Sequence, residues 1–542
     1  MWQTLFPSRN IKVIFDKDKT ETIISLIMKK VLILLSALVL FGCTAKETKS
    51  PVLTIEGGQV QGVLADNVKD VFVFRGIPYA APPIRENRWK APQPVVPWDG
   101  VYLAKRFGNP SYQHIQYKGG YYTEWGYGDE APFSEDCLYV NVWTKKPGNT
   151  SAKLPVALWI HGGGYREGFG TEPEFDAQEW AGKDVVLVSI NYRLGVYGFM
   201  AHPLLSAESP NGVSGNYGIL DMIQALKWIQ KNVEQFGGDP NNVMIFGQSA
   251  GGGAVRTLCE SPLARGLFHK AVIMSAGGLT VPNANTAAGR GGRGGFPMMG
   301  FPGAQPEPKL APYKAPVAPE GLSAFERAEF NSKVVLDWGG YNTLEKMRAA
   351  DTEVIHSISA IYASATGNRE SLSGSPLVDG YVSKESFDAA ALDGTLADVP
   401  YMIGYTMNDM GNMAAGVVAF CENRQEKGNK AWAYEFARPL PDDGSHPEVT
   451  VRLKGAFHSS DLWYVFKSLQ HGWRPWTQGD WDLSEKMLTA WTNFAKYSDP
   501  NGPNGGEWTP CTKENNNFMI FKLDKDDKEA SAMGQPVTEL GY

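Results

Sequence analysis

The sequence has few cysteines, no excess of basic residues and no apolar run long enough to span a membrane. Five Cys among 542 residues are too few for a disulfide framework, and they lack the spacing of metal ligands. Lys and Arg number 51 against 58 Asp and Glu, and the net charge of −7 argues against a general nucleic-acid-binding protein. There is no internal repeat, and no Gly-x-Gly-x-x-Gly motif follows an expected strand, so nothing supports a repeat architecture or a nucleotide site.

Apolar and aromatic residues, in contrast, are abundant, at 43% and 12% of the chain. This composition excludes a disordered chain and a collagen-like fibre. Glycine is frequent, with 59 residues, which favours close backbone approaches or a low-complexity stretch. The length alone would allow three or four domains of about 150 residues each. We therefore expect a large globular enzyme.

The first fifty residues have the features of an export signal. Residues 31–42 read VLILLSALVLFG, an apolar run that follows two lysines and is shorter than the about 20 residues of a membrane-spanning helix. A basic start, a short apolar core and a small residue before the cleavage site are typical of a signal peptide. Cys43, directly after Gly42, resembles the cysteine of a bacterial lipobox, whose thiol carries a lipid and becomes the mature N-terminus.

These features predict a signal peptide over residues 1–42, with Met28 as the true start, and a lipidated tether over residues 43–51. The protein would then be exported and anchored in the bacterial envelope, periplasmic or outer-membrane, through a lipid on Cys43. An ordinary signal peptide, which gives a secreted or periplasmic protein, and a buried apolar helix are the alternatives.

Three apolar runs have the character of buried parallel strands, at residues 154–164, 184–195 and 241–252. Between the last two, residues 215–240 carry apolar side chains at helical spacing, closed by a Gly-Gly pair. Strand, helix and strand in this order predict an α/β fold with a large, mostly parallel central sheet flanked by helices.

The remaining parts of the chain differ in character. From Val52, short strand patterns indicate an N-terminal region of antiparallel strands, and the final third is richer in helical patterns. Residues 285–320 are dominated by Gly, Pro and Ala without periodicity, which predicts a flexible insertion. Arg290 and Arg293 within it could contact RNA, but one short run in an acidic protein favours a loop.

A candidate nucleophile lies in the motif Gly-Gln-Ser-Ala-Gly at residues 247–251. The motif follows the apolar run VMIF and precedes AVRTLCE, which can form a helix. A strand, a sharp turn and a helix are the context in which a serine hydroxyl stands exposed above a sheet. The alternative is a glycine-rich turn with an ordinary serine, so Ser249 is a candidate that other motifs must support.

A second glycine-rich segment, His161-Gly-Gly-Gly, follows the apolar run at 154–160. Glycine allows successive backbone N–H groups to converge on one point, which suits a developing oxyanion. The candidate donors are the N–H groups of Gly163, Gly164 and Ala250. A tight turn without catalytic role is the alternative.

Taken together, these and other segments resemble the type-B carboxylesterase family. The segments that match in family order are FRGIPYAAPP (74–83), SEDCLYVNVW (134–143), HGGGY (161–165), NYRLGVYGF (191–199), FGGDPNNVMIFGQSAGG (236–252) and GAFHSSDLWYVF (455–466). The resemblance implies an α/β-hydrolase fold, with a single domain over residues 52–542. It also implies hydrolysis of a small-molecule ester, with no metal or organic cofactor.

Eight histidines are candidates for the general base. His458 lies in the segment that resembles the histidine segment of the family, and it follows Ser249 as the order nucleophile, acid, histidine requires. His161 belongs to the expected oxyanion turn. The others lie in segments without catalytic context: His114, His202, His269, His356, His446 and His471.

The resemblance also indicates the acid. The family has Glu or Asp after a strand in a segment like Ile-Gly-x-Thr-x-x-Glu-Gly, and this chain has MIGYTMNDMG at residues 402–411, with Asp409 at the acid's position. A carboxylate there would fix the tautomer of His458. Asp379 in PLVDGY is the alternative, although that segment resembles a structural stretch of the family.

Departures from the family pattern narrow the expected substrate. The family often has Glu before the nucleophile, whereas this chain has the neutral Gln248, which disfavours cationic choline esters. Ser111 stands where relatives have the cysteine that pairs with the SEDC cysteine, so Cys137 is expected to be unpaired. Aromatic clusters at 121–125, 462–464 and 472–476 could line a substrate pocket or belong to the core.

We therefore expect a Ser-His-Asp esterase for neutral small or aromatic esters, acting through an acyl-enzyme intermediate. One alternative is a non-catalytic adhesion or interaction protein on the same fold. Another is an amidase with the same triad, or a lipase that uses residues 285–320 as a lid. The expected partners are the ester and, through Cys43, a membrane, but not nucleic acid. The oligomeric state stays open.

Overall fold

The structure of the protein, a computed structural model, describes residues 48–115, 121–125, 132–281, 313–372, 374–411, 413–447, 449 and 453–523. The predicted signal peptide, Cys43 and most of the predicted insertion at 285–320 lie outside these residues. The part of that insertion that is described, residues 313–320, has neither helix nor strand.

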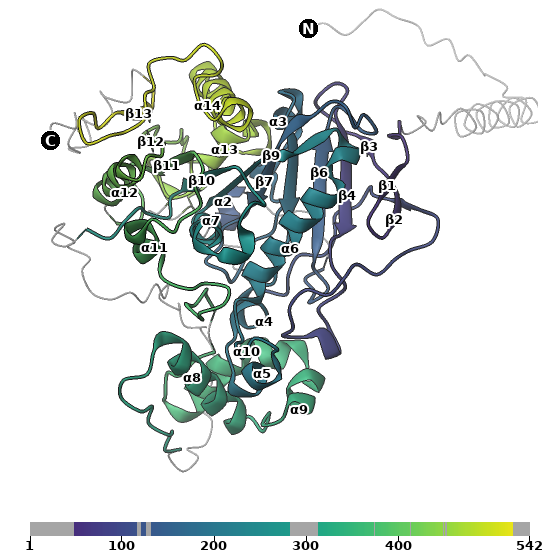
Figure 1. The fold of residues 1–542 in the computed structure, drawn as a ribbon, viewed down its shortest axis with the longest axis vertical. Helices are drawn as coiled ribbons and strands as arrows, with labels where there is room; N and C mark the ends of the chain where they lie inside the picture. Colours follow the sequence, from purple (N-terminus) through teal and green to yellow (C-terminus); the bar gives the residue numbers. More distant parts are fainter. Residues whose placement is uncertain are drawn as a thin grey trace, which may run out of the picture. The chain divides into compact units, whose positions relative to one another are not determined.

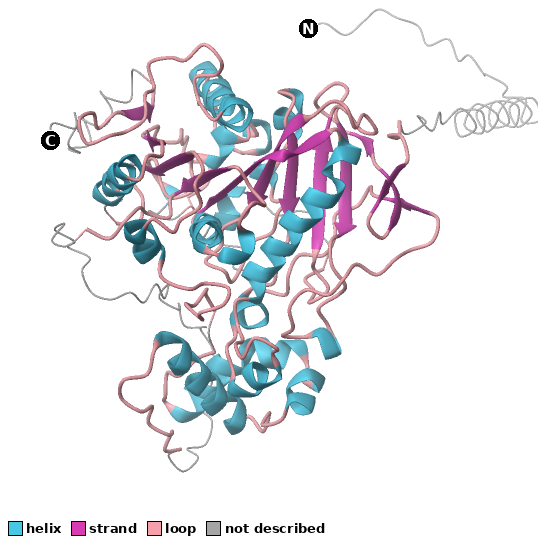
Figure 2. Ribbon diagram, in the orientation of Figure 1, coloured by secondary structure: helices cyan, strands magenta, loops and turns pink. Residues whose placement is uncertain are grey.

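A ten-stranded sheet runs through the described residues in the order β13-β12-β11-β10-β9-β7-β8-β6-β4-β3 (Figures 1 and 2). Neighbours from β13 to β8 pair in parallel, and β8, β6, β4 and β3 pair antiparallel. Its strands are β3 (Val63–Leu64), β4 (Phe72–Pro78), β6 (Tyr139–Thr144), β7 (Leu154–Ile160), β8 (Val186–Ile190), β9 (Gly238–Gln248), β10 (Lys270–Met274), β11 (Tyr401–Thr406), β12 (Ala431–Phe436) and β13 (Phe518–Phe521). A smaller sheet contains β1 (Leu53–Ile55), β2 (Gly58–Gln61) and β5 (Val101–Leu103).

The helices of the described residues flank the large sheet on both faces or lie apart from it (Figure 1). They are α2 (Tyr121–Trp125), α3 (Gln178–Gly182), α4 (Gly195–Phe199), α5 (Pro203–Glu208), α6 (Tyr217–Asn232), α7 (Ala250–Glu260), α8 (Ala324–Trp338), α9 (Leu344–Ala349), α10 (Thr352–Thr366), α11 (Phe387–Asp393), α12 (Ala414–Glu426), α13 (Leu462–Val465) and α14 (Gln478–Tyr497). This is the mostly parallel α/β arrangement that the sequence predicts, with antiparallel strands at the N-terminal end. The helix-rich final third also supplies β11, β12 and β13.

The apolar runs are continuous because each central strand is buried on both faces. In β7, Val156, Leu158 and Ile160 pack in one core cluster with residues of α6 and α7. Ala157 and Trp159 alternate with them and pack in a second cluster with residues of α3, α13 and α14. Side chains of a strand point to opposite faces in turn, so an amphipathic alternation would have left one face exposed.

The helical segment predicted before β9 consists of an α-helix followed by a 3-10 turn. Helix α6 stops at Asn232, and a 3-10 turn, Val233–Phe236, continues the chain. Gly237 then takes a φ of 81°, which a residue with a side chain rarely adopts, and β9 begins at Gly238. The Gly-Gly pair is therefore the end of the helical segment, as the sequence predicts.

Helices α8, α9 and α10 lie together beside α4 and α5, away from the large sheet (Figure 1). They share a separate core cluster, whose members include Tyr197, Leu205, Val335, Leu336, Met347, Ile355 and Tyr362. No motif in the sequence predicts this helical lobe. Its helices begin instead with local capping side chains, such as Ser323 before α8 and Asp351 before α10.

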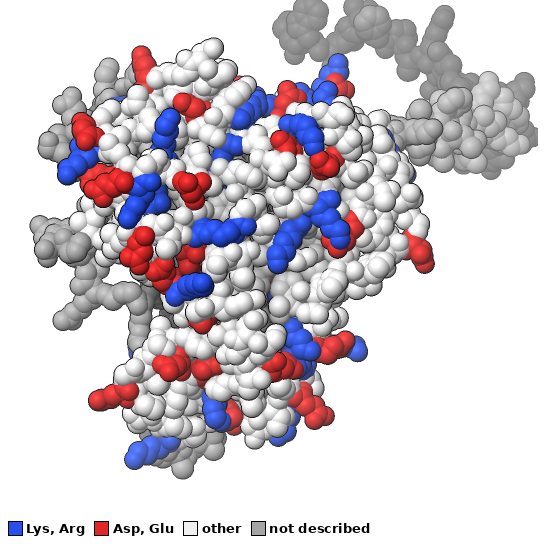
Figure 3. All heavy atoms as spheres, in the orientation of Figure 1, with Lys and Arg blue, Asp and Glu red and all other residues white. Residues whose placement is uncertain are grey.

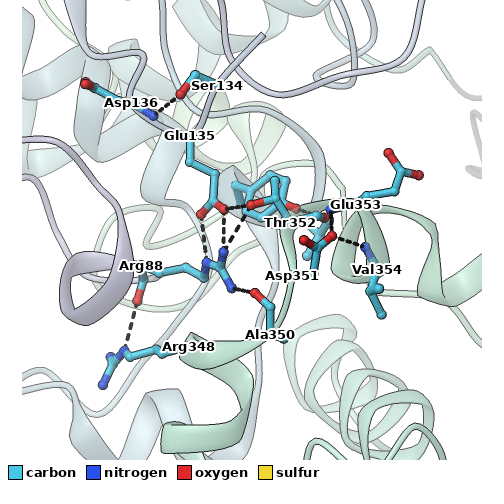
Figure 4. A network of polar contacts seen from close by, with 12 residues as sticks. Arg88, Ser134, Glu135, Asp136, Arg348, Ala350, Asp351, Thr352, Glu353 and Val354 are labelled. Atoms are coloured by element: carbon cyan, nitrogen blue, oxygen red, sulfur yellow. Dashed lines mark hydrogen bonds and ion pairs between the residues drawn. The ribbon is translucent and has the colours of Figure 1, made fainter.

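A buried ion pair between Arg88 and Glu135 of the SEDC segment contacts this lobe (Figure 4). Arg88 binds Glu135 through two hydrogen bonds, of 2.7 Å from Nε and 2.5 Å from Nη2. The same guanidinium donates to the carbonyl of Ala350 at 2.8 Å, and the Thr352 hydroxyl donates to Glu135 at 2.6 Å. Loss of one partner of a buried ion pair strongly destabilises a protein, because the other charge is left buried and unpaired. These contacts therefore hold the lobe against the SEDC segment.

Lys and Arg are interspersed with Asp and Glu on the face drawn in Figure 3. That face has no extended basic patch of the kind that binds nucleic acid. Within the part of the chain that the structure describes, no helix has both the length and the apolar character needed to cross a membrane.

Candidate active site

Ser249 lies in a sharp turn between β9 and α7, the context that the sequence predicts for it. Strand β9 ends at Gln248 and α7 begins at Ala250. Ser249 has φ 57° and ψ −122°, a conformation that non-glycine residues rarely adopt. Its N–H donates to the carbonyl of Met274 at 2.9 Å, and its carbonyl accepts from the N–H of Gly253 at 2.9 Å. The strained backbone is therefore held from both sides.

The turn after β7 lies beside this serine because β7 and β9 pair in parallel. Ile160 is opposite Gly247, so the segments that follow both residues meet at one edge of the sheet. A Cβ on Gly162 would lie 3.2 Å from the Cβ of Ser249. A Cβ on Gly251 would lie 2.0 Å from the carbonyl oxygen of Ile160, so only glycine fits there. The two glycine-rich motifs are thus parts of one site.

The three predicted oxyanion donors lie on these two turns. Gly163 has a φ of 93°, and a Cβ there would lie 1.9 Å from the carbonyl oxygen of Glu167. Among the hydrogen bonds of the described residues, none uses the N–H of Gly163, Gly164 or Ala250. Such N–H groups can donate to a ligand atom.

His161 has a structural role in the same turn. Its Nδ1–H donates to the carbonyl of Gly162 at 2.9 Å, and its ring stacks on Tyr192 with centroids 4.4 Å apart. Burial lowers the pKa of His161 to about 3, so the imidazole is neutral at physiological pH. The Tyr192 hydroxyl in turn donates to the His161 carbonyl at 2.9 Å.

His458 and Asp409 form a buried hydrogen bond. The His458 Nδ1 lies 2.6 Å from the Asp409 Oδ1, and the two side chains are 5% and 1% exposed. Asp409 follows β11, and its carboxylate also accepts from the N–H groups of Thr406 and Met410. The two loops are joined through Asn408, whose N–H donates to the carbonyl of Ala456 and whose Oδ1 accepts from the Ala456 N–H.

The carboxyl of Asp409 remains ionised although it is buried. Burial opposes ionisation, but the hydrogen bond and charge of His458 outweigh it and lower the pKa of Asp409. With Asp409 ionised, Nδ1 of His458 carries the ring proton, and Nε2 is the ring nitrogen that can accept one. That Nε2 lies 3.3 Å from the Nε2 of Gln248, the residue before Ser249. Among the described residues, no hydrogen bond joins His458 to the Ser249 hydroxyl itself.

The alternative acid, Asp379, lies in a different environment. Its Oδ1 accepts from the N–H groups of Tyr381, Val382 and Ser383, and its Oδ2 accepts from Asn216 at 2.9 Å. These contacts stabilise a turn. No hydrogen bond among the described residues links Asp379 to a histidine, so it is Asp409 that His458 contacts.

Two residues of the site were missed by the sequence interpretation. Ser275 follows β10, is buried, has a φ of 49°, and its hydroxyl lowers the pKa of Asp409. Asp461 lies three residues after His458 and accepts from the Tyr434 hydroxyl at 3.2 Å. Burial and the nearby charge of Asp409 raise the pKa of Asp461 to about 7. A polar residue inside an apolar run, as in VIMSAGG and SSDLWYVF, is the signal that could have identified both.

Cys137 is a free, buried thiol, as expected. Its hydrogen-bond partner is Ser111, the residue at the position where relatives have the second cysteine. The Ser111 hydroxyl also accepts from the N–H of Leu194 at 3.1 Å. The two segments thus keep their proximity through hydrogen bonds.

Two of the aromatic clusters singled out in the sequence, at 462–464 and 121–125, lie in different surroundings. Leu462, Trp463 and Tyr464 are at most 1% exposed and belong to the core. Tyr121, on α2, lies with its ring 6.4 Å from that of His458 and stacks on Trp125. The cluster at 121–125 therefore has a ring close to the candidate base. The described residues include no group of three His, Cys, Asp or Glu that could hold a metal ion.

Comparison with known proteins finds similarity to one family. A model of the carboxylesterase family matches residues 49–291 and 411–537. Fumonisin B1 esterase of Sphingopyxis macrogoltabida is 44% identical over 235 residues, which are 43% of this chain and 41% of that protein. Para-nitrobenzyl esterase of Bacillus subtilis is 40% identical over 238 residues, which are 44% of this chain and 46% of that protein. The match thus spans less than half the length of these two curated relatives.

The similarity extends further in three dimensions. A solved carboxylesterase of Geobacillus stearothermophilus has a TM-score of 0.66 and 26% identity to this chain. The match covers 87% of this chain and 96% of that structure. The α/β-hydrolase fold that the sequence motifs imply is thereby confirmed.

Replacing Asp461 by asparagine should stabilise the protein more at high pH than at low pH. The folded-state pKa of Asp461, about 7, lies above the ordinary value of 3.8, so its stabilising contribution is present in acid and is lost as the pH rises through 7. Asparagine does not ionise. The melting temperature of Asp461→Asn minus that of the wild type should rise by several degrees between about pH 5 and about pH 8. A difference that does not change with pH would contradict this reading of the buried carboxyl.

Proposed function

Because this chain belongs to the carboxylesterase family, we propose that it is a serine carboxylic ester hydrolase that acts through Ser249, His458 and Asp409. The observation that carries the proposal is the buried bond of 2.6 Å between His458 Nδ1 and Asp409 Oδ1. The other ring nitrogen of His458 faces the side chain of Gln248, the residue before Ser249. A nucleophile, a base and an acid that orients the base are the components of serine acyl transfer.

In the first step, the Ser249 oxygen attacks the ester carbonyl while its proton passes to His458 Nε2. The side chain of Gln248, which lies 3.3 Å from this nitrogen, must move aside for the serine to donate to it. Asp409 stabilises the imidazolium that forms, and the N–H groups of Gly163, Gly164 and Ala250 would stabilise the oxyanion.

In the second step, the tetrahedral intermediate collapses. The imidazolium gives its proton to the leaving alkoxide, which departs as the alcohol, and Ser249 retains the acyl group. Water then attacks the acyl-enzyme, with His458 again as the base, and the carboxylic acid is released. Each proton that His458 accepts is returned in the same half-reaction, so the enzyme is regenerated.

We propose neutral small or aromatic esters as the substrates. The neutral Gln248 stands next to Ser249, and the ring of Tyr121, which stacks on Trp125, lies near His458. Glu167, close to Gly163, would attract a cation only when ionised, and burial raises its pKa to about 7. The name of the para-nitrobenzyl esterase that resembles this chain is consistent with an aromatic ester.

We further propose that the protein is exported and held at a bacterial membrane by a lipid on Cys43. The support is the sequence alone, a basic and apolar leader that ends at Gly42-Cys43. Cys43→Ala in the full chain should move the protein from the membrane pellet to the soluble fraction of a lysed Gram-negative host. A variant that stays in the pellet and still incorporates labelled fatty acid would disprove this anchor.

Replacing the nucleophile should abolish hydrolysis without unfolding the protein. We expect Ser249→Ala to lower kcat by about 10⁴- to 10⁶-fold and to prevent labelling by a fluorophosphonate probe. The exposed Ser151→Ala is the matched control and should leave both unchanged. The assay should use aryl acetates, short-chain esters, long-chain esters and the corresponding amides.

The wild-type profile over that panel separates the possible activities. Highest kcat/KM with aryl or short-chain esters would support the proposal. Preference for long acyl chains would indicate a lipase, and preference for amides an amidase. Absence of both turnover and probe labelling would indicate a non-catalytic protein on this fold.

Three substitutions should distinguish which aspartate is the acid. Asp409→Asn removes the charge that orients His458, and kcat should fall by about 10³- to 10⁴-fold. Asp409→Glu keeps a carboxylate and should retain more activity. Asp379→Asn should lower the melting temperature but change kcat only a few-fold, because Asp379 stabilises a turn. A large loss of kcat in Asp379→Asn with a small one in Asp409→Asn would reverse the assignment.

A further inference from the structure

Two of the buried cysteines lie next to each other. Cys421 on α12 and Cys511 before β13 are both at most 1% exposed and belong to the same core cluster. Their side chains are hydrogen-bond partners. They are 90 positions apart in the chain, so the spacing of cysteines in the sequence does not indicate that they meet.

Contacts of the neighbouring residues hold the two thiols together. Gln425 follows Cys421 by four residues and thus lies on the same face of α12. Its side chain accepts from the N–H of Lys513 at 3.0 Å and donates to Glu514 at 2.9 Å. The N–H of Cys511 donates to the carbonyl of Ala431, the first residue of β12, at 2.9 Å. The segment 511–514 is therefore bound to both the helix and the sheet.

We propose that Cys421 and Cys511 form a disulfide bond in the mature protein. In this step both thiols lose their protons and together two electrons, and a bond forms between the two sulfur atoms. The electrons pass to a disulfide oxidant, such as glutathione disulfide or a thiol-disulfide oxidase, which is reduced to two thiols. An exported protein meets such oxidants, whereas the cytosol keeps thiols reduced.

The chemistry of the pair suits this exchange. The two thiols are hydrogen-bonded to each other. Once one of them has formed a mixed disulfide with the oxidant, the other therefore lies in position to displace it. Cys259, which is hydrogen-bonded to Tyr401, and Cys137, which is bonded to Ser111, have no such thiol partner among the described residues.

The bond would fasten the edge of the large sheet. Strand β13 is the last strand in the sheet and pairs only with β12 in the described sheet. A link between Cys511, which precedes β13, and α12 closes a loop of about 90 residues, and closing a long loop reduces the entropy of the unfolded chain. The oxidised protein should therefore be the more stable form.

Peptide mapping tests the bond directly. The full-length protein is equilibrated in a buffer of oxidised and reduced glutathione, blocked with N-ethylmaleimide, unfolded in guanidinium in the continued presence of the blocker, and digested with trypsin without reductant. We expect a linked pair of the peptides 385–424 and 497–513, which dithiothreitol separates. Recovery of both peptides only as maleimide adducts would overturn the proposal.

Variants connect the bond to stability. The melting temperature of the oxidised wild type should exceed that of the reduced protein by several degrees. The difference should vanish in Cys421→Ser and in Cys511→Ser, and it should persist in the matched control Cys259→Ser. If the difference persists in Cys421→Ser, the bond is not its source. Neither readout depends on esterase activity, so this outcome and that of the proposed function are independent.

Discussion

The parallel pairing of β7 with β9 is the constraint on which the candidate site depends. It sets Ile160 opposite Gly247, so that the turns after both strands share one edge of the sheet. Helices on both faces bury the strands and leave the carboxyl edge as the region where side chains can meet a ligand. The two backbones approach so closely that Gly251 leaves no room for a Cβ. The pairing of β7 with β9, the glycines of the two turns and the strained backbone of Ser249 therefore form the candidate site together.

Asp409 and His458, the proposed acid and base, reach the same edge from the second half of the chain. Asp409 follows β11, two strands beyond β9, and the loop with His458 is fixed to it through Asn408. Two buried carboxyls of this region have pKa values that are shifted in opposite directions. The pKa of Asp409 is lowered because His458 and backbone N–H groups stabilise its charge. The pKa of Asp461 is raised because its carboxyl is buried and lies near the negative charge of Asp409.

Local sequence signals predicted the parts of the fold that depend on a few neighbouring residues. The strand, turn and helix around Ser249, the helix end at Gly237 and the buried central strands all follow from apolar runs, helical periodicity and glycine. The helical lobe was not predicted, since its attachment depends on the ion pair of Arg88 with Glu135 and on contacts from α9 and α10. Such contacts join distant segments and leave no local pattern.

The sequence by itself indicated the family, the candidate nucleophile and the candidate oxyanion segment, because each of these depends on contiguous residues whose backbone requirements are local. It also made Asp409 the preferred acid, but only through resemblance. Only the tertiary structure decided that His458 contacts Asp409 and not Asp379, and it revealed Ser275, Asp461 and the adjacent thiols of Cys421 and Cys511. These depend on which residues meet across the sheet, and that is fixed by long-range packing rather than by spacing along the chain.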